Sequence, residues 1–163
     1  MVDTAALQAY SLFGGLTTEQ VDLIRPLMGS ASFNTGDVII AEGKPNDSIY
    51  FIVEGRVAVS RSGVHIVDLP EGQTFGEMEL LDIMPSVATV SAATPVRVVT
   101  ISNRAVRAIA SNDPKVFGLV IMNLARDLSR RLRHMDEMAC DSASAQSSFI
   151  SPSESPTYTP FLG

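Results

Sequence analysis

The chain has 163 residues, of which 45% are hydrophobic, and a formal net charge of −6. These values fit a single globular domain, and the acidic balance excludes a chain-wide basic surface for nucleic acid or anionic lipid. The single cysteine, Cys140, excludes an internal disulfide, and the two histidines, His65 and His134, are too few for a histidine-rich metal site. Because the chain has neither a long apolar run nor a signal-peptide pattern, we expect a soluble cytoplasmic protein that holds no metal.

The first predicted element is a short helix that begins after Thr17. Thr17 and Gln20 have the spacing of a capping box, in which each side chain bonds to the backbone of the other residue. The apolar face of this helix is predicted to comprise Val21, Leu23, Ile24, Leu27 and Met28.

Short segments rich in β-branched residues follow the helix. They predict strands at residues 38–41, 48–53, 56–60, 64–69, 88–92 and 96–101. Turn signals built on glycine, proline, asparagine and aspartate separate these strands. This spacing indicates antiparallel sheets in a sandwich or barrel, and no helix between them is long enough for parallel crossovers. We therefore predict a mainly β fold with flanking helices.

Helices return after residue 101. Ser102 is predicted to cap a short helix that ends at Ala110, and Asp113-Pro114 is predicted to start a long helix that ends near Ala139. Apolar residues recur along the long helix at steps of three and four, at Phe117, Ile121, Leu124, Leu128, Leu132, Met135 and Met138. We expect a domain over residues 1–139 and a flexible Ser/Pro-rich tail over residues 140–163.

The segment from Phe75 to Val90 carries the most informative pattern. A strand is predicted to end in Phe75-Gly76, a single helical turn follows at residues 77–81, and Pro85 ends the loop before the next strand. A glycine ahead of a helical turn lets backbone N–H groups point at a bound anion. The carboxylate of Glu77 can accept hydrogen bonds from a pair of sugar hydroxyls. The segment therefore predicts a cradle for a sugar phosphate.

In the order of its motifs the chain resembles the cyclic nucleotide-binding domain family, which includes the bacterial catabolite activator and the regulatory subunits of cAMP-dependent kinase. The resemblance covers roughly residues 12–139 and rests on Leu12–Leu16, Gly36-Asp37, Glu42-Gly43, Tyr50–Gly55, Phe75–Glu77 and Pro85–Val90. It implies a jelly-roll-like β-roll, an antiparallel double-stranded β-helix, with an N-terminal helix and a long C-terminal helix. It also implies cAMP or cGMP as a possible small ligand, with no cofactor required.

The resemblance further implies a ligand site at Phe75, Gly76, Glu77, Met78, Ser86, Val87 and Ala88. By this resemblance Gly76 and Glu77 hold the ribose 2′-hydroxyl, and backbone N–H groups near Met78 and Val87 face the cyclic phosphate.

Two residues depart from the family's pattern in this site. The family has an arginine directly after the proline, where this chain has Ser86, and often a small residue where this chain has Glu79. We expect the lost positive charge and the added negative charge to weaken cyclic-nucleotide binding by about tenfold to a hundredfold or more. Other arginines considered as replacements are Arg56, Arg61 and Arg97 on the strands and Arg131 on the long helix.

Two functional hypotheses follow. The first is a regulatory module that senses a small ligand in the β-roll and signals through its C-terminal helix; the second is a ligand-free domain that serves for dimerisation or protein docking. In both, the partner is a second copy or a protein effector, and the predicted dimer seam is Ile121, Leu124, Leu128, Leu132 and Met135. No nucleophile–base pair is visible, so we expect no enzyme, and a Ser/Pro-rich tail in place of a helix-turn-helix predicts no DNA binding by this chain alone.

Overall fold

The structure is a computed structural model that describes residue 7 and residues 10–78 and 84–147. Two compact units make up the chain, residues 1–127 and residues 128–163. The first unit contains all the strands that the structure describes, and the long helix α5 (Pro114–Ser147) begins in the first unit and ends in the second.

The N-terminal elements are η1 (Ser11–Phe13), α2 (Thr18–Ile24) and η2 (Arg25–Leu27). The predicted capping box is confirmed, because Gln20 N donates to Thr17 Oγ1 at 3.3 Å and Thr17 N donates to Gln20 Oε1 at 3.0 Å. The predicted apolar face is wrong at three positions. Leu23 is 55% exposed, and the helix ends at Ile24, so Leu27 lies in η2 and Met28 is the first residue of a strand.

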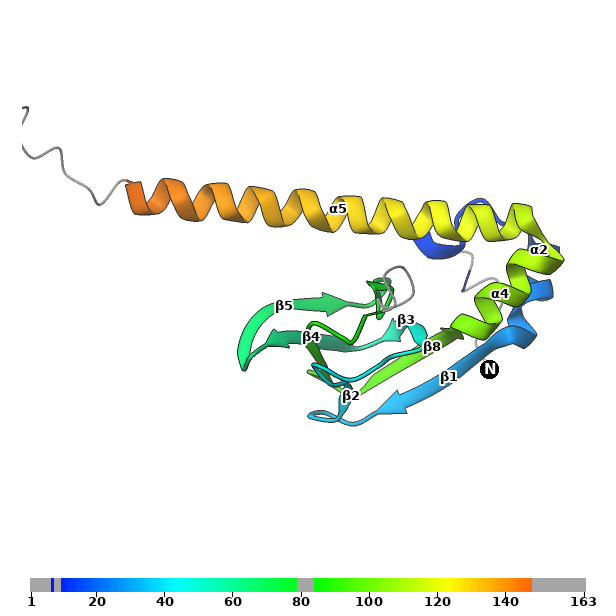
Figure 1. Ribbon diagram of the computed structural model, residues 1–163, viewed down its shortest axis with the longest axis horizontal. Helices are drawn as coiled ribbons and strands as arrows, with labels where there is room; N and C mark the ends of the chain where they lie inside the picture. The colour runs from blue at the N-terminus through cyan, green and yellow to red at the C-terminus, as the bar shows by residue number, and fades with distance from the viewer. Residues whose placement is uncertain (1–6, 8–9, 79–83, 148–163) are drawn as a thin grey trace, which may run out of the picture. The chain divides into compact units, whose positions relative to one another are not determined.

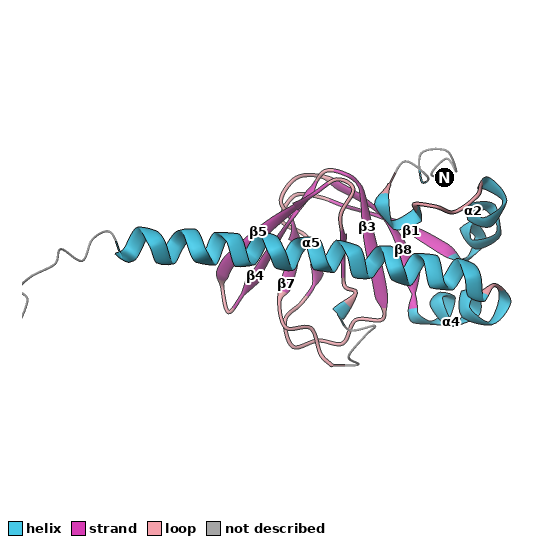
Figure 2. Cartoon of the chain, turned by 90° about the horizontal axis from the view of Figure 1, so that it is seen from above, coloured by secondary structure: helices cyan, strands magenta, loops and turns pink. Residues whose placement is uncertain are grey.

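The strands form two four-stranded sheets, and every pairing is antiparallel. One sheet has the order β1 (Met28–Phe33), β8 (Val96–Ser102), β3 (Ser48–Glu54) and β6 (Thr74–Phe75). The other has the order β2 (Val38–Ile40), β7 (Thr89–Ala92), β4 (Arg56–Arg61) and β5 (Val64–Pro70). Figure 2 shows the two groups of strands. The predicted fold class, a β-roll with flanking helices, is confirmed.

Both faces of strand β3 are buried, and this divides the core into two clusters. Ile49, Phe51 and Val53 point into a cluster with the N-terminal elements, the two C-terminal helices and part of β8. Ile52, which alternates with them, points into a second cluster whose members come from both sheets. Alternation along a strand sends successive side chains to opposite faces, so β3 separates the helical layer from the interior of the roll.

The helix caps predicted from the sequence are confirmed. Ala105 N donates to Ser102 Oγ at 3.2 Å at the start of α4 (Asn103–Asn112), and Lys115 N and Val116 N each donate to Asp113 Oδ1 at 3.0 Å at the start of α5. Figure 1 shows α4 beside α2, at the end of the roll where β1 begins and β8 ends.

Helix α5 differs from the prediction at its end and in its buried face. It continues to Ser147 rather than ending near Ala139, because residues 140–147 contain no glycine or proline to stop it. The first part of the predicted flexible tail is therefore helical, and residues 148–163 lie outside the described residues. Leu124, which we predicted in the dimer seam, is 1% exposed and packs with Val116 and Val120 in the core of its own unit.

Candidate functional site

The candidate site begins where strand β6 ends. Gly76 follows Phe75 with a φ of +77°, a conformation that side-chain-bearing residues rarely adopt. A Cβ at this position would lie 2.7 Å from Ser48 O and 2.8 Å from Asn46 Nδ2. Asn46 Nδ2 donates to Ser48 O at 2.7 Å and to Gly76 O at 3.2 Å, so one amide side chain holds the turn in place. Only glycine fits here.

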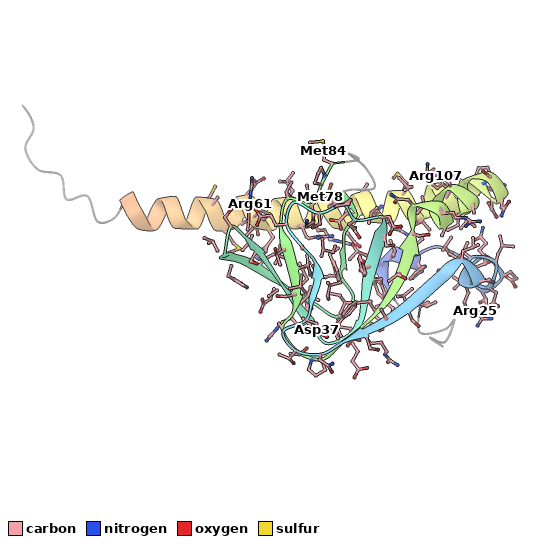
Figure 3. All side chains as sticks on the ribbon, turned by 60° about the horizontal axis from the view of Figure 1, so that its bottom comes forward. Arg25, Asp37, Arg61, Met78, Met84 and Arg107 are labelled. Atoms are coloured by element: carbon pink, nitrogen blue, oxygen red, sulfur yellow. The ribbon has the colours of Figure 1, made fainter. Side chains whose placement is uncertain are left out.

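The next two residues point in different directions. Glu77 is 3% exposed, although the charged carboxylate of a glutamate normally lies on the protein surface in contact with water. Met78 is more than half exposed, and Figure 3 shows Met78 and Met84 on the same side of the roll. Glu79 lies outside the described residues, as does most of the predicted helical turn at residues 77–81. The turn at Gly76 thus places a buried carboxylate at the rim of the roll.

Ser86 lies on the other arm of this loop and is also buried, with 7% exposed. Its Oγ donates to Ala88 O at 3.2 Å, so the hydroxyl is bonded to the backbone of its own segment, just before β7. Its backbone pairs with the turn after β2, because Ser86 N donates to Lys44 O at 2.9 Å and Gly43 N donates to Ser86 O at 2.7 Å. Val87, the next residue, is about half exposed and Ala88 is half-buried.

A cavity of about 520 Å³ adjoins Gly76. Its lining includes Ile39, Ile40, Ala41, Lys44, Asn46 and Tyr50. Ile40 and Asn46 are also two of the three closest neighbours of a Cβ built on Gly76, which places the cavity directly beside the glycine turn. The sequence reasoning missed Lys44. Its position directly after Glu42-Gly43, one of the motifs used for the family resemblance, was the signal that could have found it.

Phe75, predicted as a ligand-site residue, belongs to the core. It is 2% exposed in the cluster between the sheets, and its ring stacks on Tyr50 with a centroid distance of 4.8 Å and an interplanar angle of 3°. Since Tyr50 also lines the cavity, Phe75 packs against a residue of the cavity wall.

The three strand arginines considered as replacements are not among the described lining residues of the cavity. Arg56 Nε is 3.3 Å from Asp68 Oδ2, and Arg97 Nη2 is 3.1 Å from Glu54 Oε2, each in a solvent-exposed ion pair. Arg61 is exposed at the end of β4. Arg131 lies in the second unit, so its role at the site stays a prediction.

A second cavity, of about 610 Å³, shares no lining residue with the first. Leu7, Arg25, Met28 and Val99 are among its walls, and the described residues of its lining include none from the segment between Phe75 and Val90. Within the described ranges, no three His, Cys, Asp or Glu side chains lie close enough together to hold a metal ion. None of the helices in the same ranges is both long and apolar enough to cross a membrane.

Residues 31–113, about half of the chain, match the family model of the cyclic nucleotide-binding domain. The chain belongs to the cyclic nucleotide-binding domain family. The match covers the glycine turn, Glu77, Ser86 and the cavity residues Ile40 and Lys44. The resemblance seen in the sequence is thereby confirmed, while the role of each cyclic nucleotide-binding-domain site residue in this chain stays a prediction.

Similar proteins use this domain as one part of a longer chain. The chain is 32% identical over 131 residues to Glutaminase 2 of Bradyrhizobium diazoefficiens, covering 80% of this chain and 21% of that protein. It is 39% identical over 98 residues to a cyclic nucleotide-gated potassium channel of Rhizobium etli, covering 60% of this chain and 26% of the channel. This chain therefore spans about a fifth to a quarter of the length of these curated relatives.

Among solved structures, the catabolite activator protein of Thermus thermophilus has the same fold. It superposes with a TM-score of 0.67 and 29% sequence identity, covering 82% of this chain and 63% of that protein.

Proposed function

We propose that this protein is a regulatory module that binds a cyclic nucleotide in its β-roll and transmits the binding event through helix α5. The observation that carries the proposal is the buried carboxylate of Glu77, which directly follows a left-handed glycine beside a cavity of about 520 Å³. A carboxylate at this position can accept charge-assisted hydrogen bonds from a pair of ribose hydroxyls. The module acts by binding, not by catalysis.

The phosphate end of the ligand would face the second arm of the loop. The backbone N–H groups near Met78 and Val87 border this arm, and both residues are about half exposed, so a ligand can approach them. The family's arginine is absent, because Ser86 occupies that position and bonds to Ala88 O. We therefore expect cAMP or cGMP to bind about tenfold to a hundredfold more weakly than it would with an arginine.

The route out of the β-roll follows the first half of α5. Val116, Val120 and Leu124 are buried in the same cluster as Phe51 of strand β3. Asn123, also buried, donates to Leu12 O at 3.1 Å and to Gly14 O at 2.8 Å, which ties α5 to η1. A ligand that shifts the roll therefore acts on packed neighbours of α5, and packed cores respond in discrete steps.

A homodimer through the second half of α5 is part of the proposal. Leu132 and Met135 are 62% and 56% exposed, and Leu128, half-buried, lies seven residues before Met135. Exposed apolar residues at heptad spacing suit pairing with a second copy. Ile121 is half-buried in the first unit, and Leu124 is excluded from the seam by its burial.

A ligand-free docking module is the second candidate, and the neutral Ser86 favours it. Thermal unfolding with and without millimolar cAMP or cGMP separates the two, since a ligand that binds only the folded state raises Tm. The ligand-sensing module predicts a higher Tm with at least one nucleotide. An unchanged Tm with both would leave the docking module as the better account.

Ser86→Arg is the sharper variant. We expect it to raise cyclic-nucleotide affinity by about tenfold or more, because a charged guanidinium beside the phosphate replaces a neutral hydroxyl. Ser111→Arg, an exposed serine on α4, is the matched control and should leave affinity unchanged. Calorimetric titration measures both. An unchanged affinity for Ser86→Arg in a protein that still folds would show that position 86 does not face the phosphate.

A further inference from the structure

We propose that Lys44 supplies the positive charge for the ligand's phosphate that other members obtain from the residue at position 86. This inference rests on the proposed function, and it names a residue from a different strand connection as the cation of the site.

The backbone holds Lys44 against Ser86. Ser86 N donates to Lys44 O at 2.9 Å, and Gly43 N donates to Ser86 O at 2.7 Å. Backbones paired in this way lie about 5 Å apart, and an extended lysine side chain spans about 6 Å from Cα to Nζ. The ammonium group of Lys44 can therefore reach the space that a side chain at position 86 would fill, although 42 residues separate the two in sequence.

The turn that carries Lys44 is fixed from several sides. Lys44 N donates to Ala41 O at 3.1 Å, and Glu42 N donates to Thr89 Oγ1 at 3.1 Å. Ser62 N, at the tip of the β4–β5 hairpin, donates to Glu42 Oε2 at 2.7 Å. A binding residue on such a turn has its backbone held in place before the ligand binds, which lowers the entropic cost of binding.

The nearby carboxylates are directed at other groups. Both Glu42 oxygens face Ser62, whose Oγ lies 3.4 Å from Oε1. Asp47, which also lines the cavity, accepts a hydrogen bond from Ser48 Oγ at 2.8 Å. Among the described residues Lys44 forms no ion pair, and it lines the cavity together with Asp47, whose Oδ1 is bonded to Ser48.

The cavity wall is otherwise poor in positive charge. Among the described residues of its lining, Lys44 is the one Lys or Arg, beside apolar Ile39 and Ile40, the amide of Asn46 and the carboxylate of Asp47. An anionic group that enters this cavity therefore meets the cation of Lys44, on the turn whose backbone pairs with Ser86. The ligand class is a nucleotide or sugar whose phosphate carries one negative charge.

The test compares cAMP binding by calorimetric titration in the wild type, Lys44→Ala and Lys44→Arg. We expect Lys44→Ala to lose about tenfold or more in affinity and Lys44→Arg to stay close to the wild type, because charge rather than shape is required. Lys115→Ala is the matched control, since Lys115 is the chain's other lysine and is exposed at the start of α5. Adenosine, which has no phosphate, should bind Lys44→Ala and the wild type equally.

A double-mutant cycle with Ser86→Arg tests whether side chains at positions 44 and 86 can each supply the cation for the phosphate. With an arginine at position 86, the loss caused by Lys44→Ala should shrink, because the phosphate keeps a cation. A wild-type protein that binds cAMP, with Lys44→Ala binding equally well, would overturn this inference and leave the proposed function standing. A folded wild-type protein that binds neither cAMP nor cGMP would overturn the proposed function, and this inference with it.

Discussion

Gly76 shows how one residue positions the site. Its φ of +77° and the 2.7 Å approach of Ser48 O mean that any side chain meets backbone as well as torsional strain. We expect Gly76→Ala to lower the free energy of unfolding by more than about 2 kcal/mol. Gly63→Ala is the matched control, because Gly63 has a φ of +78° but no atom within 4 Å of its Cβ position, and it should cost only about 1 kcal/mol. Urea denaturation measures both, and equal losses would contradict the packing argument.

At the same scale, the sequence predicted the part of the site that is local in the chain. Gly76, Glu77 and Ser86 lie within one segment whose turn chemistry can be followed residue by residue. Lys44 was missed because the backbone hydrogen bonds of Lys44 and Gly43 with Ser86 join distant segments, and the pattern of a single sequence does not contain such a pairing. The burial of Phe75 was missed for a related reason, since its partner Tyr50 lies on another strand.

Asn123 is the residue through which helix α5 is joined to the N-terminal element η1. Replacing it by leucine removes the donor from the buried carbonyl group of Leu12 and the partly buried carbonyl group of Gly14. We expect Asn123→Leu to lower the free energy of unfolding by about 2–4 kcal/mol, because each carbonyl loses its partner. Met122→Leu is the control, because Met122 is the exposed neighbour of Asn123, and it should change the free energy of unfolding by less than about 0.5 kcal/mol. A loss of that smaller size in Asn123→Leu would show that these two hydrogen bonds do not hold η1.

The helices and strands with a strong local sequence pattern were predicted, and the strand that depends on pairing with a distant strand was not. The β-branched strands and the three helix caps follow from local sequence, and all appear in the structure. Strand β1, with the sequence MGSASF, has small residues and no alternation of the usual kind. It forms because it pairs with β8 along its whole length, from Met28 opposite Ile101 to Phe33 opposite Val96. Pairing with β8 therefore outweighs the weak intrinsic strand propensity of these residues.

At the scale of the whole molecule, the exposed apolar residues of α5 predict association with a second copy. We expect Leu128→Glu to convert the proposed dimer to a monomer, because a carboxylate in the seam is desolvated without a partner. His134→Glu is the control, since it introduces the same side chain at an exposed position outside the seam residues and should remain dimeric. Multi-angle light scattering reports the mass directly. A dimer that persists in Leu128→Glu would place the interface elsewhere.

The central claim is that the β-roll binds a cyclic nucleotide beside Gly76 and Glu77. Calorimetric titration of the wild-type protein with cAMP and with cGMP, at low ionic strength, tests it most directly. We predict saturable binding of at least one of the two, with one site per chain and an affinity weakened by the neutral Ser86. A folded protein that gives no binding heat and no change in Tm with either nucleotide at millimolar concentration would contradict it.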